Sequence, residues 1–192
     1  GDDDRNSYFS KIINNIFLIC SFICIIMLAA MPIIFKLLVE ESYSSAYTYI
    51  PILICASFFE LFSILIGGVF IALKLPKQIA TTTIIGGLIN IAINILFLKK
   101  YGLIVACIST LVSYMYISVT RYIKISKYLK IKLDSYKYFL IIILYIITVF
   151  IYYYKSVIAS IVSIVVLCII FFKINQKKLM IILKKITERK NI

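Results

Sequence analysis

The sequence contains no histidine and no tryptophan, and only eight of its 192 residues are acidic. Histidine is the commonest general base and a frequent metal ligand, so its absence removes the simplest basis for proton-transfer or metal chemistry. The chain also lacks a glycine-rich phosphate loop, a pair of neighbouring carboxylates and a nucleophile beside a base. We therefore expect no catalytic residue, no metal and no cofactor, and we predict that the protein is not an enzyme.

The five cysteines are the only other residues that suggest a metal. Cys20 and Cys24 share one face of an expected helix, which is a possible ligand spacing. All five cysteines, however, lie inside apolar runs without a histidine or an acid nearby. We therefore favour their interpretation as small buried apolar residues.

Long apolar runs dominate the chain. Hydrophobic residues make up 63% of it, and the mean hydropathy is +1.06. Ten-residue segments with period-two alternation, typical of a membrane barrel, are not visible. We predict an all-α, polytopic membrane helical bundle whose lobe covers residues 1–173, with a basic cytoplasmic tail at 174–192. The six predicted transmembrane helices cover residues 12–38, 48–73, 79–98, 103–123, 138–154 and 157–172.

The net charge of +13 raises the possibility of a nucleic-acid partner, but the positions of the charges argue against it. Lysine and arginine lie between and after the spans, and 17 of the 21 fall on one side of the predicted topology. Cytoplasmic segments are enriched in these residues. We therefore predict that both termini are cytoplasmic and that nucleic acid is not a partner. The basic residues on the opposite side are Lys36, Lys99, Lys100 and Lys155.

Glu60 is the only acid inside a predicted span. A carboxylate in hydrocarbon is costly, so Glu60 is expected to face protein or water and is a candidate functional residue. One interpretation is coupling to protons or sodium, or contact with cargo. The other is a protonated or hydrogen-bonded packing residue. The sequence leaves both open.

Three more polar residues within spans are candidates for binding or coupling. Asn90 and Asn94 continue a four-residue stride that begins at Thr82 and Gly86. Small and amide side chains hold membrane helices together. We therefore favour a role in helix packing for Asn90 and Asn94 over a role in lining a cavity. Arg121 lies at the inner end of its span. It either binds a phosphate there or is the first residue of the cytoplasmic basic cluster.

Between residues 32 and 127, a set of residues follows one another in an order that is typical of a known family. It consists of Pro32, Ser42-Tyr43, Ala46, Ile50-Pro51, Lys74, Lys77, Asn90, Asn94, Tyr101-Gly102, Ala106, Ser109-Thr110 and Ser113-Tyr114. This order resembles the C-terminal half of bacterial oligosaccharide flippases. These are the O-antigen and capsule repeat-unit flippases of the multidrug/oligosaccharidyl-lipid/polysaccharide flippase superfamily. The family tends to have a Gly-Ala pair where this chain has Val105-Ala106, so that signature is partial.

The resemblance implies two helical lobes around a central cavity, with this chain forming most of the second lobe. The implied function is transport of undecaprenyl-diphosphate-linked oligosaccharide across the bacterial cytoplasmic membrane by alternating access. The implied partners are lipid-linked oligosaccharide, membrane lipids and the N-terminal lobe of the same full-length protein. The chain begins with glycine rather than methionine, which agrees with a C-terminal piece or a processed start.

Other functions remain as alternatives. One is another membrane protein of the polysaccharide pathway, a polymerase or an acyltransferase, although the outer loops are short for an extramembrane site. A second is an ion-coupled transporter similar to multidrug exporters. A third is a small structural or channel-forming membrane protein that self-associates through the Gly67-Gly68 or Gly86-Gly87 face.

Overall fold

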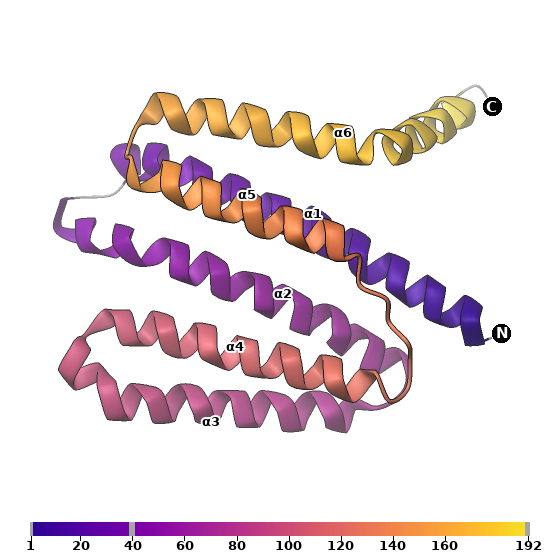
Figure 1. The fold of residues 1–192 in the computed structure, drawn as a ribbon, viewed down its shortest axis with the longest axis horizontal. Coiled ribbons are helices and arrows are strands. Elements are labelled where there is room, and N and C mark those ends of the chain that lie inside the picture. Colours follow the sequence, from indigo (N-terminus) through magenta and orange to yellow (C-terminus); the bar gives the residue numbers. More distant parts are fainter. Residues whose placement is uncertain (1, 39–40, 191–192) are drawn as a thin grey trace.

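The protein forms six long α-helices and one 3₁₀-helix in a computed structural model that describes residues 2–38 and 41–190 (Figure 1). Those residues contain no β-strand. Each of the six α-helices is long and apolar enough to cross a membrane, so the predicted all-α, multi-pass membrane bundle is confirmed. The elements are α1 (Asp2–Leu38), η1 (Glu41–Tyr49), α2 (Ile50–Ala72), α3 (Pro76–Tyr101), α4 (Leu103–Ile125), α5 (Ser135–Tyr153) and α6 (Val157–Lys190).

The helix boundaries differ from the predicted ones mainly near the chain ends. α1 begins at Asp2, well before the predicted start at residue 12, because its polar N-terminal turns pack against a segment far along the chain. α6 continues to Lys190 without a break at the predicted boundary between residues 173 and 174. The predicted cytoplasmic location of the tail stays a prediction.

The helices form two groups (Figure 1). In one group, α4 packs extensively against both α2 and α3, whereas α2 and α3 touch each other little. In the other group, α1 packs against α5 and α6. Contacts between α1 and α2 join the groups. The start of α1 and the end of α6 lie at the end of the bundle that also holds the α2–α3 turn (Figure 1). We call it the terminal end, and the opposite end the hairpin end.

Close packing of α3 on α4 depends on a missing side chain. A Cβ atom added at Gly86 would lie 2.5 Å from the Cδ1 atom of Ile117, whereas one added at Gly87 would meet nothing within 4 Å. Gly67 of α2 is buried in the same way against α4, and Gly68 is exposed. In each pair, one glycine thus packs against α4 of the same chain and is not free to contact a second copy. This finding weakens the alternative of self-association through both glycines of each pair.

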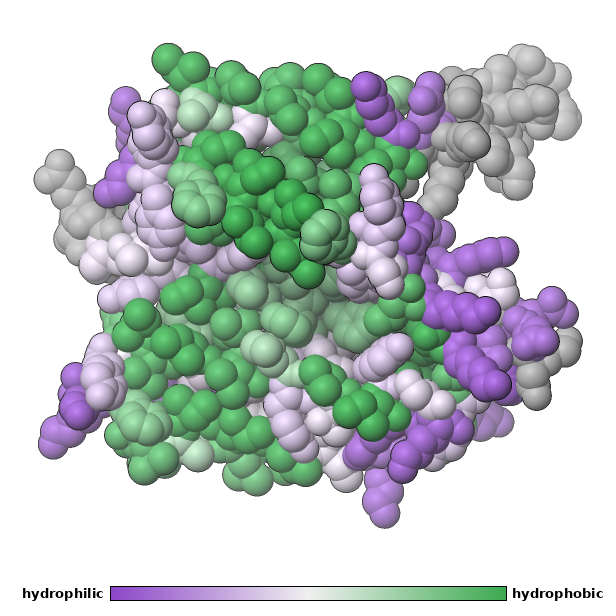
Figure 2. Space-filling view, viewed as in Figure 1, coloured by the Kyte–Doolittle hydropathy of each residue, from purple (hydrophilic) through white to green (hydrophobic). Residues whose placement is uncertain are grey.

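The outer surface of the helices is apolar along its length (Figure 2). Large side chains such as Ile95 and Ile158 are each 76% exposed, and Phe150 is 75% exposed. Hydrophilic residues gather at the two ends of the bundle instead (Figure 2). Exposed aliphatic side chains between polar ends are the pattern that a hydrocarbon environment requires.

Residues 130–134, which we call the strap, run in extended conformation along the polar side of α1. Asn6, Ser10 and Asn14 accept hydrogen bonds from the strap amides at positions 130, 132 and 134, at 3.2, 3.0 and 3.0 Å. The Asn14 amide also donates to the carbonyl of residue 132 at 2.8 Å. The spacing of the strap amides matches the spacing of their acceptors on α1. Residues two apart in an extended chain are separated by about 6.6 Å, and residues four apart in an α-helix by about 6 Å along its axis.

At the hairpin end, a pair of tyrosines joins η1 to α5. The Tyr47 and Tyr152 rings stack with centroids 4.1 Å apart, and each hydroxyl donates to the backbone carbonyl of the other residue. Tyr145 also donates to the carbonyl of Pro51. α5 is therefore fixed at both ends, by the tyrosine pair at one end and by the strap at the other.

We predict that Asn14→Leu releases the strap. The substitution leaves a carbonyl and an amide of the strap without partners, which costs about 2–3 kcal/mol of unfolding free energy. Hydrogen exchange measured by mass spectrometry checks this, with faster exchange expected at the amides of residues 132 and 134. Ser126→Ala is the control, because its exposed hydroxyl bonds only within its own turn. Unchanged exchange in the Asn14 variant would contradict the role of the strap.

Candidate functional site

Arg121 is buried near the terminal end of α4 and contacts both neighbouring helices. Only 5% of its surface is exposed. On α3, its Nε donates to the Thr82 hydroxyl at 3.0 Å and its Nη2 to the Thr83 hydroxyl at 2.8 Å. On α2, its Nη1 donates to the Ser63 carbonyl at 2.8 Å. A longer bond of 3.3 Å joins Nη2 to the Ile79 carbonyl. The guanidinium thus links α2, α3 and α4.

Arg121 is held by neutral oxygens rather than by a carboxylate. Its fork of N–H donors suits several acceptors in a fixed geometry, which a lysine ammonium does not match. Gly67 provides the space: a Cβ atom there would lie 3.1 Å from Nη1 of Arg121. The structure places the guanidinium inside the helix junction, where protein oxygens accept its hydrogen bonds. Phosphate binding by Arg121 stays a prediction.

Glu60 lies half-buried on α2 and accepts a hydrogen bond of 2.9 Å from the Tyr114 hydroxyl of α4. No ion pair involving Glu60 occurs among the residues that the structure describes. The polar bonds of Arg121 all go to other groups. Glu60 therefore has a neutral partner that the sequence could not identify, since the two residues are separated by 54 positions.

Asn90 and Asn94 of α3 both face α4. The Asn94 amide donates to the Ser109 hydroxyl at 2.8 Å, and the Asn90 amide donates to Ser109 at 3.2 Å and to Thr110 at 3.5 Å. The Oδ1 atom of Asn94 is buried without a hydrogen-bond partner. These contacts support the helix-packing interpretation that we favoured for the two asparagines.

The four candidate residues do not converge on one pocket. Their contacts with α4 are spread along that helix. Ser109 binds the two asparagines, Tyr114 binds Glu60, and Arg121 lies about 18 Å from Ser109 along the helix. Ser118 adds a hydrogen bond to the carbonyl of Phe59 within this row. The polar stripes of α2, α3 and α4 therefore face one another. We call this row of buried polar contacts the polar seam.

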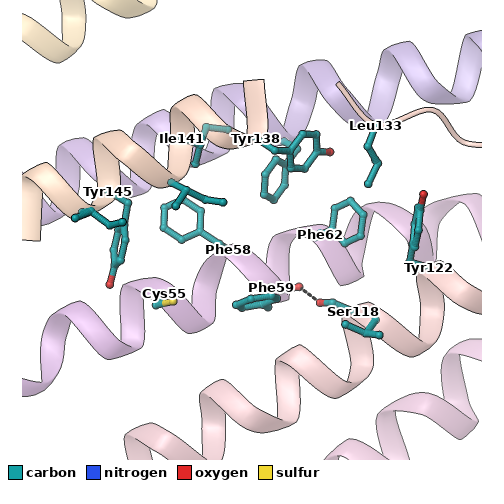
Figure 3. A pocket seen from close by; sticks show the side chains of 14 residues that line it. Cys55, Phe58, Phe59, Phe62, Ser118, Tyr122, Leu133, Tyr138, Ile141 and Tyr145 are labelled. Carbon is teal, nitrogen blue, oxygen red and sulfur yellow. Dashed lines mark hydrogen bonds between the residues drawn. The ribbon is translucent and has the colours of Figure 1, made fainter. Parts of the chain in front are cut away.

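An apolar cleft of about 520 Å³ lies between α1 and α5 on one side and α2 and α4 on the other (Figure 3). Phe58, Phe59 and Phe62 of α2 form its lower wall in this view, and Tyr138 and Ile141 of α5 face them. The Tyr138 hydroxyl is buried without a hydrogen-bond partner. None of the four candidate residues lines the cleft.

A second hollow, of about 750 Å³, lies at the terminal end between α1, the strap and the start of α5. It is polar and carries four lysines and two acids. Asp134 precedes α5, and its carboxylate pairs with Lys137. The hydrogen bond from Lys137 is the main cause of the lowered pKa of Asp134. The lysines are Lys11, Lys130, Lys132 and Lys137, and the acids are Asp3 and Asp134.

The sequence analysis predicted neither the apolar cleft nor the polar hollow. A usable signal was nevertheless present in residues 129–134, where apolar and polar residues alternate. Period-two alternation indicates an extended segment with one buried face. Leu129 and Ile131 are indeed buried, whereas Lys130 and Lys132 are exposed.

No protein-family model, curated protein or solved structure matches this chain. The six apolar helices define the class of the chain as a multi-pass α-helical membrane protein.

We predict that Arg121→Lys destabilises the fold. An ammonium group cannot reach acceptors on α2 and α3 at once, and losing charge-assisted hydrogen bonds costs about 2–3 kcal/mol. Thermal unfolding in detergent micelles, followed by circular dichroism, measures the change. Lys124→Gln, one turn further along α4, is the control and is expected to unfold like the unmodified protein. Equal stability of both variants would show that the guanidinium geometry is unimportant.

Proposed function

We propose that this chain is the C-terminal part of a membrane transporter that moves undecaprenyl-diphosphate-linked oligosaccharide across the bacterial cytoplasmic membrane. The transported molecule has a polar sugar-diphosphate head and a long apolar tail. In this proposal the chain supplies one wall of the transport path, and an N-terminal lobe of the same protein supplies the other. Alternating access arises from rocking of the two lobes. The pathway served is surface polysaccharide biosynthesis, for O-antigen or capsule.

Glu60 is the observation on which this proposal depends most. An intramembrane carboxyl group is costly, and here its described partner is a neutral phenol rather than a cation. The side chain is half-buried, so a proton or a polar cargo group can reach it without opening the core. A group with these properties suits a coupling or cargo-contact site better than a purely structural one.

The apolar cleft supports a lipid-linked cargo. Its walls consist mainly of phenylalanine, isoleucine and tyrosine side chains, which suit a hydrocarbon or isoprenoid tail. It lies between the two helix groups, where a small change in their separation would alter its width.

The proposed orientation places the terminal end in the cytoplasm. The strap, the α2–α3 turn, the start of α1 and the end of α6 lie at that end, and most lysines and arginines belong to these segments. The hairpin end carries few basic residues, which agrees with an outward location.

A second candidate function is ion-coupled export of small molecules, as in multidrug exporters. The same carboxyl group supports it, because a titratable group within the membrane can couple transport to protons or sodium. The two functions differ in cargo, and the tests below separate them.

We predict that Glu60→Gln in the full-length protein impairs export of surface polysaccharide at least tenfold. The amide keeps the size and a hydrogen bond to Tyr114 but cannot carry charge. Immunoblotting or staining of surface polysaccharide, at matched protein level, measures the effect. Ser57→Ala is the matched control, because Ser57 lies on the same helix and its hydroxyl bonds only to the Leu53 carbonyl.

Three outcomes are informative. Loss in the Glu60 variant alone supports the proposal. Normal polysaccharide and unchanged sensitivity to toxic cations in both variants show that Glu60 is only structural. Normal polysaccharide with increased sensitivity to toxic cations in the Glu60 variant favours the multidrug function instead.

A further inference from the structure

The polar hollow at the terminal end has a fixed framework. The strap forms one wall and is held by Asn6, Ser10 and Asn14 of α1. Ser10 and Asn14 are each only 8% exposed, so this wall is part of the folded core. The hydrogen bonds use the strap backbone. The side chains of Lys130 and Lys132 are therefore not needed to hold the strap in place.

The alternation of the strap determines where its lysines lie. Leu129 and Ile131 are buried in the apolar core beneath it, whereas Lys130 and Lys132 line the hollow. Lys11 of α1 lines the same hollow. Three lysines from two distant parts of the chain thus line one space.

The charges of the hollow do not cancel. Lys137 forms an ion pair with Asp134. Lys11, Lys130 and Lys132 form no ion pair with any residue whose side chain the structure describes. Asp3 is the other acid on the lining, and it is exposed at the outermost turn of α1. The hollow therefore keeps a net positive charge, which favours an anionic ligand.

The position of the hollow along α1 places it at the membrane surface. α1 has 37 residues and is about 55 Å long, whereas a hydrocarbon core is about 30 Å thick. Its polar N-terminal turns, which carry Asn6, Ser10 and Asn14, therefore extend into the headgroup layer. The strap is followed directly by α5, which begins at Ser135.

The neighbouring surface is suited to a hydrocarbon chain. Leu133 and Tyr138 line the apolar cleft, and the residues next to them in sequence, Asp134 and Lys137, line the polar hollow. An amphiphile whose phosphate lies in the hollow has apolar surface close by. A free phosphate ion would gain nothing from that surface.

We propose that the hollow bordered by Lys11, Lys130 and Lys132 binds the phosphate headgroup of an anionic lipid of the surrounding leaflet. Ammonium groups act as point charges toward phosphate, and basic pockets between membrane helices suit such headgroups. The proposal concerns a resident lipid rather than cargo. It holds whichever transport function the protein has.

The test uses the whole chain, purified and delipidated in detergent. Native mass spectrometry counts bound dioleoylphosphatidylglycerol, with dioleoylphosphatidylcholine, which is zwitterionic, as the reference of zero net charge. Lys130→Gln/Lys132→Gln is the variant, and Lys99→Gln/Lys100→Gln is the matched control, because it removes two exposed lysines at the hairpin end. Circular dichroism confirms that both variants keep their helices.

We expect the strap variant to bind phosphatidylglycerol roughly thirtyfold more weakly, from the free energy that two lysines contribute near a membrane surface. The control is expected to bind it like the unmodified protein. Equal loss in both variants would show only general attraction to basic residues and overturn the proposal. Displacement of the lipid by millimolar inorganic phosphate would also overturn it, since it would identify a free anion as the ligand.

Discussion

A buried guanidinium organises half of this bundle. Arg121 donates hydrogen bonds to both α2 and α3, which hardly touch each other directly. Removing a cation from water is expensive unless its donors are satisfied, so the helices around it must supply acceptors at fixed positions. Gly67 must stay without a side chain to admit the guanidinium, and Thr82 must face α4. This single group thus specifies the mutual register of three helices.

The polar seam has a consequence for function. In lipid, apolar surface gives helices little reason to associate, so polar and small residues supply much of the contact specificity. Arg121, Asn90, Asn94 and Ser118 take part in such contacts, and Glu60 adds the one carboxyl group, half-buried with a hydroxyl partner on α4. The unfilled spaces lie elsewhere, at the boundary between the helix groups and at the terminal end. The bundle therefore combines a group of helices joined by polar contacts with hollows beside it.

The number of spans and their approximate limits followed from hydropathy alone, because twenty apolar residues leave few structural choices. The interhelical role favoured for Asn90 and Asn94 also agrees with their contacts. The partner of Glu60 did not follow, since pairing with Tyr114 depends on how α2 and α4 pack. The burial of Arg121 was missed because a basic residue at a span end fits the positive-inside pattern equally well. The strap was missed because its alternation is short and lies between two much stronger apolar signals.

The most direct test of the central claim compares two adjacent glycines of α2. Gly67→Ala places a methyl group 3.1 Å from Nη1 of Arg121, whereas Gly68→Ala meets nothing within 4 Å. Both substitutions gain the same helix propensity. Unfolding of each variant in detergent micelles should show Gly67→Ala to be less stable than Gly68→Ala by about 1–2 kcal/mol, the usual cost of overpacking. Equal stability of the two variants would contradict the claim that α2, α3 and α4 are organised around the guanidinium.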